Sequence, residues 1–135
     1  MNLLLEVIVD RKIISTSEAP KAIGPYSQAV AAGGFVFVSG QIPIDPGTGN
    51  VLQKDIAVQT ALVLDNAKAI LAASGCSLRS VVRTTIYLKN MADFPAVNEV
   101  YGGYFPSDPP ARATVEVARL PKDAAIEMDF VAWKG

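Results

Sequence analysis

The sequence contains no histidine, and this absence excludes several common kinds of chemistry. Hydrolase triads with an imidazole base need a histidine, and so do metal sites with imidazole ligands. There is one cysteine, Cys76, so an internal disulfide and a cysteine-ligated zinc site are excluded as well. We expect Cys76 to be a small packing residue, and this sparing use of cysteine suits a cytoplasmic protein.

Charge of one sign is not in excess either. The chain has 12 Lys and Arg against 13 Asp and Glu, a formal net charge of -1, and its basic residues are scattered along the sequence. Nucleic-acid-binding proteins usually carry a clustered basic patch. We therefore do not expect RNA or DNA as the main partner.

Long hydrophobic runs are missing too. The longest apolar stretch, residues 3–9, is interrupted by Glu6 and ends at Asp10. A membrane span needs about 20 apolar residues, and a secretory signal needs a basic start and a longer apolar stretch. No membrane partner is expected. The stretch is either an extra edge strand or vector or upstream sequence translated by accident, and the residues leave both readings open.

Glycine-rich phosphate loops are also absent. Neither the GxGxxG nor the GxxxxGK[ST] pattern occurs, so the sequence lacks the usual motifs for binding a nucleotide cofactor. What is present is a chain of 135 residues, of which 50% are apolar and 19% charged. This size and composition predict one folded domain.

The order of the expected elements predicts an α+β domain with a mixed sheet. Gly33 and Gly34 join two strand-like runs and favour a tight hairpin. Asp55 is placed to cap a long helix, and Gly75 is placed to end it. The first expected strand begins at residues 13–14 and ends in the loop at residues 17–25. The other expected strands cover residues 27–32, 35–38, 81–88, 112–119 and 126–133, and the expected helices cover residues 55–74 and 93–105.

Two helices can cover only one face of such a sheet. Because side chains alternate along a strand, we expect the other face to be polar. That face either meets solvent or is the contact surface of an oligomer. Its expected members are Arg83, Thr85, Tyr87, Arg112 and Glu127, and Thr84 is a polar exception on the apolar side.

Arg112 and Glu127 are the strongest chemical pair in the sequence. A single Arg or Glu on a sheet is usually just solvated, but Arg112 directly follows a stiff Pro-Pro-Ala entry that fixes its position. Glu127 stands between two apolar residues, where partial burial would shift a carboxyl towards general acid or base work. A guanidinium can grip a carboxylate with two parallel hydrogen bonds. The sequence therefore predicts Arg112 as an anchor for a small carboxylate and Glu127 as the group that moves a proton.

Several blocks of sequence carry a specific resemblance. Residues 110–123, PARATVEVARLPKD, with 126–128, IEM, resemble the signature of the RidA (YjgF) family of reactive-intermediate imine deaminases. Residues 23–29, 39–43 and 93–101 resemble further blocks of the family in the same order. The resemblance covers residues 12–135, and residues 1–11 form an N-terminal extension outside it.

The resemblance implies a chorismate-mutase-like single domain, with two helices packed on one face of the sheet, that assembles as a homotrimer with ligand clefts between subunits. It also implies hydrolysis of 2-imino acids, such as 2-iminobutanoate and 2-iminopropanoate, to 2-keto acids and ammonia. These imines are released by pyridoxal-phosphate enzymes. The family needs no cofactor and no metal.

By resemblance, Arg112 would hold the substrate carboxylate and Glu127 would orient or activate the attacking water. Tyr26 would line the pocket, and the backbone at Gly40 would contact the ligand. Thr114 stands where many studied members have a cysteine, and its hydroxyl can still hydrogen-bond to a substrate. This difference puts any redox control through that position in doubt.

Asn98 also matches a family block, and we expect it to make a helix-to-loop hydrogen bond rather than to act in catalysis. Two other functions remain open besides the deaminase. One is a non-catalytic trimeric module that uses the Arg112 cleft to sense 2-keto acids or related metabolites. The other is the endoribonuclease or translation-inhibitor activity attributed to some relatives, against which the lack of a basic stripe and of histidine argues.

Overall fold

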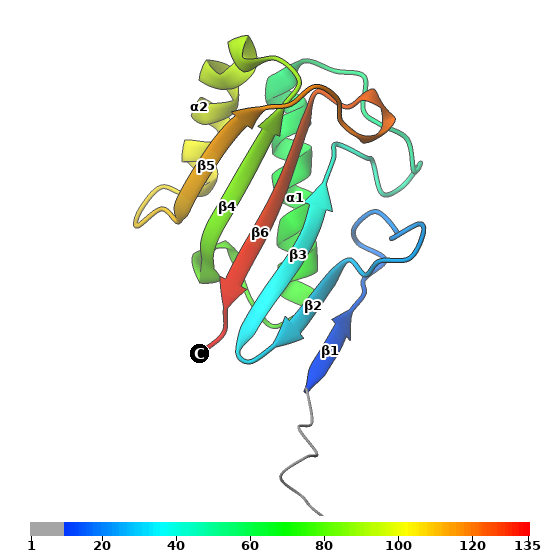
Figure 1. The fold of residues 1–135 in the computed structure, drawn as a ribbon, viewed down its shortest axis with the longest axis vertical. Coiled ribbons are helices and arrows are strands. Elements are labelled where there is room, and N and C mark those ends of the chain that lie inside the picture. The colour runs from blue at the N-terminus through cyan, green and yellow to red at the C-terminus, as the bar shows by residue number, and fades with distance from the viewer. Residues whose placement is uncertain (1–9) are drawn as a thin grey trace, which may run out of the picture.

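The computed structural model describes residues 10–135 as one mixed, six-stranded sheet with two helices. The strands lie in the order β1-β2-β3-β6-β4-β5, in which β4 and β5 are parallel and the other neighbours are antiparallel (Figure 1). Residues 3–9, for which the sequence left open an edge strand or translated vector or upstream sequence, lie outside the described residues. The strands are β1 (Arg11–Ile14), β2 (Ala29–Ala32), β3 (Phe35–Gln41), β4 (Val81–Leu88), β5 (Ala111–Glu116) and β6 (Ile126–Trp133).

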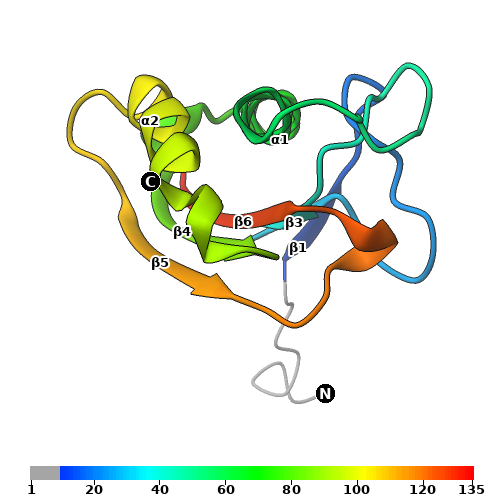
Figure 2. The same cartoon turned by 90° about the horizontal axis from the view of Figure 1, so that it is seen from above.

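Helices α1 (Ile56–Ala73) and α2 (Phe94–Tyr104) lie side by side on the same face of the sheet (Figure 2). This confirms the predicted α+β class and the two helices on one face. Three short 3-10 turns complete the chain: η2 (Leu78–Ser80), η3 (Met91–Asp93) and η4 (Pro121–Asp123).

Local sequence signals account for the hairpin and for the long helix. Gly33 and Gly34 adopt φ values of 58° and 83°, which a two-residue hairpin of this kind requires, and β2 pairs with β3 across them. The Asp55 side chain accepts a hydrogen bond from the backbone N–H of Val58 at 3.0 Å and caps α1. Gly75, with φ of 81°, follows the last turn. Both predictions are confirmed.

The core lies between α1, α2 and the sheet, and it consists mainly of aliphatic side chains from the three central strands and from both helices. Helix α1 is long and apolar enough to cross a membrane, with a mean hydropathy of 1.4, but core helices pass the same test. Thr84, the polar exception on β4, is buried, and its hydroxyl shares a hydrogen bond of 2.8 Å with the Tyr101 hydroxyl on α2. This bond satisfies both hydroxyls inside the core.

The two faces of the sheet can be assigned from the strand register, because residues paired across neighbouring strands point to the same side. Thr84 pairs with Arg112 and Ile86 pairs with Thr114, so both β5 residues lie on the helix side. Tyr87 pairs with Glu127, on the open side.

The prediction that Arg112 and Glu127 share one face is therefore wrong. Strand β5 is at the sheet edge, where α2 leaves its polar side chains exposed although they point to the helix side. Its apolar residues Ala113 and Val115 point to the open side instead, so polarity does not identify the faces of this strand.

Two smaller expectations also differ from the structure. Strand β5 ends at Glu116, short of the predicted residue 119. Simple alternation along β4 would place Val82 on the apolar side with Thr84, but Val82 is exposed, because the register with β6 shifts between Val81 and Arg83.

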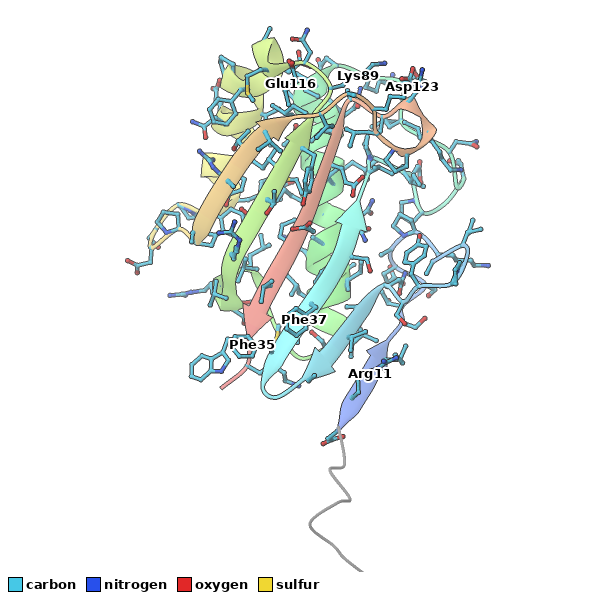
Figure 3. The ribbon with its side chains drawn as sticks, in the orientation of Figure 1. Arg11, Phe35, Phe37, Lys89, Glu116 and Asp123 are labelled. Atoms are coloured by element: carbon cyan, nitrogen blue, oxygen red, sulfur yellow. The ribbon has the colours of Figure 1, made fainter. Side chains whose placement is uncertain are left out.

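The open face of the sheet carries large exposed apolar side chains. Phe37 and Trp133 are 48% and 54% exposed, and Phe35 stands beside Phe37 on β3 (Figure 3). A contiguous apolar surface of this kind is typical of a protein contact rather than of a solvated sheet.

Candidate functional site

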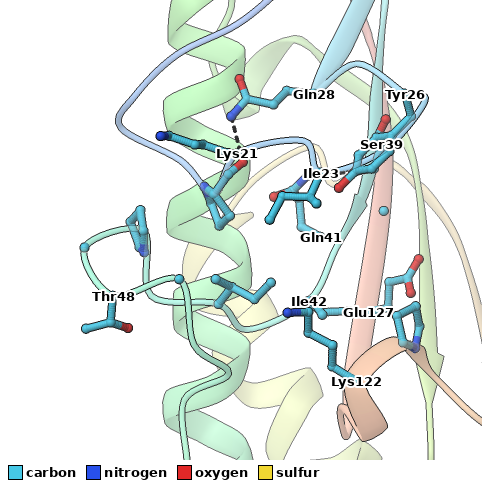
Figure 4. Close-up of a pocket in the computed structure, with 17 residues that line it drawn as sticks. Lys21, Ile23, Tyr26, Gln28, Ser39, Gln41, Ile42, Thr48, Lys122 and Glu127 are labelled. Atoms are coloured by element: carbon cyan, nitrogen blue, oxygen red, sulfur yellow. Dashed lines mark hydrogen bonds between the residues drawn. The ribbon is translucent and has the colours of Figure 1, made fainter.

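A cavity of about 820 Å³ opens where the loop before β2, the end of β3 and the start of β6 come together. Its wall includes Tyr26, Ser39, Gly40, Lys122 and Glu127. Figure 4 shows Tyr26, Ser39 and Glu127 on one side of the cavity and Thr48 on the other. The structure thus brings together three of the residues singled out in the sequence, namely Tyr26, Gly40 and Glu127.

Glu127 is the acidic residue of the cavity wall. It is half-buried, and its pKa is raised above the ordinary value, first by the loss of solvent around the carboxyl and then by the negative charge of Asp129. A carboxyl with a raised pKa is a stronger base when it is ionised. The position therefore suits proton transfer to or from a bound molecule.

Gly40 makes room for this carboxyl. A Cβ atom built on Gly40 would overlap Oε2 of Glu127 and would stand 2.8 Å from its Cδ. The register between β3 and β6 is irregular from Val38 to Gln41, which contains this close approach. Glycine is therefore required here for space, whatever its backbone contacts with a ligand.

The loop that carries Tyr26 is fixed by a buried amide. The Gln28 side chain accepts a hydrogen bond from the Thr16 N–H at 2.7 Å and donates to the carbonyls of Thr16 and Pro20 at 3.0 and 2.7 Å. Gln28 also lines the cavity. The sequence analysis missed this role, and the only available signal was its place within the block at residues 23–29.

Two lysines in the cavity wall were also missed by the sequence analysis. Lys21 comes from the loop before β2, and Lys122 comes from η4, where it adopts a positive φ of 55°. Nothing in the local sequence places these two lysines in the wall of one cavity with Glu127, because the loops that carry them meet only in the folded chain.

Arg112 lies outside this cavity, on the helix side of β5. Its Nη1 donates a hydrogen bond to Asn98 Oδ1 at 2.8 Å. The guanidinium carbon stands 5.3 Å from the ring centre of Phe94 and 4.8 Å from that of Tyr101. These contacts hold the guanidinium in place while the side chain stays exposed.

Asn98 accepts this bond, which connects helix α2 to strand β5, so the expected helix-to-loop bond is wrong in its partner. Thr114 follows Arg112 on the same side of β5 and is half-buried. The structure thus places Arg112 and Thr114 together and separates them from the cavity of Glu127. Within residues 10–135, no group of three or more acidic or cysteine side chains is arranged to hold a metal ion.

This architecture defines a small, chorismate-mutase-like α+β domain with a half-buried carboxyl in a cavity. The family model for endoribonuclease L-PSP matches residues 16–134. The chain therefore belongs to this family, which is also called the YjgF/RidA family.

Named relatives span nearly the whole chain. A RutC family protein of Pyrococcus horikoshii is 56% identical over 92% of this chain and 98% of its own. The human 2-iminobutanoate/2-iminopropanoate deaminase is 46% identical over 93% of this chain and 91% of its own. The crystal structure of E. coli TdcF with bound serine superposes with a TM-score of 0.88 at 43% identity, covering 92% of this chain and 99% of that one.

Proposed function

We propose that this protein hydrolyses reactive 2-imino acids, such as 2-iminobutanoate and 2-iminopropanoate, to 2-keto acids and ammonia. The observation that carries the proposal is the half-buried Glu127 carboxyl, which stands in a cavity beside a glycine that leaves it room. The human relative bears the name of this activity, and E. coli TdcF binds serine, a small amino acid with the carboxylate that Arg112 would recognise.

The proposed reaction is the addition of water to a C=N bond followed by loss of ammonia. Ionised Glu127 takes a proton from water while the oxygen forms a bond to the imine carbon, and the C=N bond becomes a C–N single bond. The same carboxyl then returns the proton to nitrogen. The carboxylate next takes the hydroxyl proton and passes it to the amine nitrogen; as the C–N bond breaks, ammonia leaves and the C–O bond becomes the C=O of the keto group.

Arg112 is proposed to hold the substrate carboxylate with two parallel hydrogen bonds. Its contact with Asn98 and its stacking on Phe94 and Tyr101 support this role, because they fix the guanidinium before the ligand arrives. Thr114 is proposed to hydrogen-bond the same ligand, because it is the next residue after Arg112 on the same side of β5. Tyr26 is proposed to close the side of the cavity.

A single chain separates Arg112 from Glu127 by the thickness of its sheet. We therefore propose that each site combines Glu127, Tyr26 and Gly40 of one chain with Arg112 and Thr114 of a second copy. A homotrimer would hold three such sites, and the exposed apolar residues of the open face support contact between copies. The proposed location is the cytoplasm.

A coupled assay tests the reaction. A threonine dehydratase generates 2-iminobutanoate, and semicarbazide traps the imine that survives. Added protein should lower the yield of trapped imine in proportion to its concentration. The same yield at every concentration would reject the deaminase and would leave the keto-acid-binding module, which needs the Arg112 anchor but no turnover.

A chain-mixing experiment tests the shared site. Arg112→Ala and Glu127→Gln should each be nearly inactive alone. Trimers refolded from an equal mixture should recover about a quarter of the wild-type activity, because in a ring one contact in four pairs an intact Arg112 with an intact Glu127. No recovery in mixed trimers would contradict a site built from two chains.

The endoribonuclease activity named for the family model is not favoured by any feature of the described cavity. The chain has a formal net charge of -1, and a groove that tracks nucleic acid is strongly basic.

A further inference from the structure

A second acidic residue stands beside Glu127 on the open face of the sheet. Glu127 and Asp129 are two positions apart on β6, so their side chains point to the same side. On the neighbouring strand β4, Tyr87 pairs with Glu127 and Thr85 pairs with Asp129. Glu127, Asp129 and Tyr87 therefore form one cluster, of which only Glu127 has a part in the proposed reaction.

Tyr87 holds Asp129 in this cluster. The Tyr87 hydroxyl donates a hydrogen bond to Asp129 Oδ2 at 2.9 Å. Donation to the carboxylate, together with burial and the negative charge of Asp129, raises the pKa of the Tyr87 phenol, so the proton stays on the tyrosine. The Asp129 carboxylate is thereby tied to β4 beside Glu127 rather than left free to turn into solvent.

The other charged or titratable residues that line the cavity of Glu127 come from two loops. Lys21 and Tyr26 belong to the loop before β2, and Lys122 belongs to η4. In the described part of the chain, neither lysine makes an ion pair with Glu127. The fixed charge that acts on the Glu127 carboxyl from its own sheet face is that of Asp129.

We propose that Asp129, held by Tyr87, is a positioning residue that makes Glu127 a stronger base towards the attacking water. The catalytic part of this inference rests on the proposed function, whereas the electrostatic part does not. A negative charge beside a carboxylate favours its protonated form, so Glu127 accepts the proton of water more readily. Asp129 itself does not touch the substrate.

The variant Asp129→Asn tests the proposal, because it removes the charge and nearly keeps the shape. Carbon-13 NMR of the Glu127 side chain, recorded without substrate, should show a titration midpoint at lower pH than in the wild type. The acidic limb of the kcat profile in the coupled assay should move to lower pH in parallel. KM should stay unchanged, because the carboxylate anchor is intact.

The chain offers a matched control. The Tyr104 hydroxyl donates a hydrogen bond to Asp65 Oδ1 at 2.8 Å, between the two helices and away from the cavity. Asp65→Asn loses the same charge and the same kind of bond, and it should leave both the Glu127 midpoint and the kcat profile where they are.

A second variant, Tyr87→Phe, keeps the charge and releases it from its position. It should move the Glu127 midpoint in the same direction as Asp129→Asn but less far, and it carries the test if Asp129→Asn fails to fold. A wild-type midpoint in a folded Asp129→Asn variant, or in Tyr87→Phe when that variant stands alone, would overturn the proposal.

The outcomes separate this inference from the proposed function. A shifted midpoint with an unshifted kcat limb would overturn the catalytic role of Asp129. Wild-type protein without deaminase activity would reject the proposed function and that catalytic role together. The NMR titration would still decide whether Asp129 acts on Glu127.

Discussion

Gly40→Ala is a direct test of the cavity geometry, because the substitution adds one carbon beside the proposed base. The new Cβ would overlap Glu127 Oε2 and stand 2.8 Å from Cδ, whereas ordinary contact begins at 3.4 Å. The carboxyl must therefore retreat by on the order of 1 Å, and a misplacement of that size can cost about 100-fold in rate. We expect kcat in the coupled assay to fall by roughly that factor.

The fold should tolerate the same substitution. Gly40 is not among the residues with positive φ, and the atoms in conflict belong to the far end of a flexible side chain. The free energy of unfolding should therefore change by less than about 1 kcal/mol. Binding of 2-ketobutanoate should persist, because the proposed carboxylate anchor is Arg112, which the substitution does not touch.

Gly102→Ala is the matched control, because Gly102 lies in α2 and a Cβ there meets nothing within 4 Å. It should raise stability by up to about 1 kcal/mol and leave kcat unchanged. Gly40→Ala with wild-type kcat would refute the argument, because it would show that the position of the Glu127 carboxyl does not limit the reaction.

Three further predictions concern the proposed site and its assembly. Arg112→Ala should weaken 2-ketobutanoate binding by roughly 30-fold or more in calorimetry. Arg112→Lys should not restore binding, since a point charge lacks the two parallel hydrogen bonds of the guanidinium. Wild-type affinity in Arg112→Ala would show that Arg112 does not anchor the carboxylate. Glu127→Gln should keep the wild-type affinity for 2-ketobutanoate and slow turnover by about 10²- to 10⁴-fold. Turnover at the wild-type rate in this variant would show that Glu127 has no part in proton transfer. Phe37→Asp should convert the proposed trimer to monomers in light scattering, because it would bury a charge in the proposed contact. Wild-type protein with the mass of one chain would contradict the proposed trimer.

The elements of the fold could be predicted where their signals are local. Two adjacent glycines determine the hairpin, Asp55 directly precedes α1, and Gly75 follows the last helical residue, Ala73, by two positions. Strand β6 begins and ends at the predicted residues. In each case, the residues that make the structure are neighbours in the chain, so the sequence pattern and the physical cause coincide.

The geometry of the site could not be predicted, because it depends on which strands become neighbours. Alternation within β5 was assigned correctly, but the assignment of its faces needed the parallel register with β4. The approach of Gly40 to Glu127 likewise exists only because β6 inserts between β3 and β4. No pattern along the chain carries that information.

The separation of Arg112 from Glu127 also bears on the symmetry of the proposed assembly. A two-fold contact uses one surface patch twice, so both residues would have to belong to the same patch. They point to opposite sides of the sheet, which favours a contact between two different surfaces. Such head-to-tail contacts either close into a ring or continue into a filament. A closed trimer is the proposed solution, because a ring leaves no copy with an Arg112 lacking a Glu127 or a Glu127 lacking an Arg112.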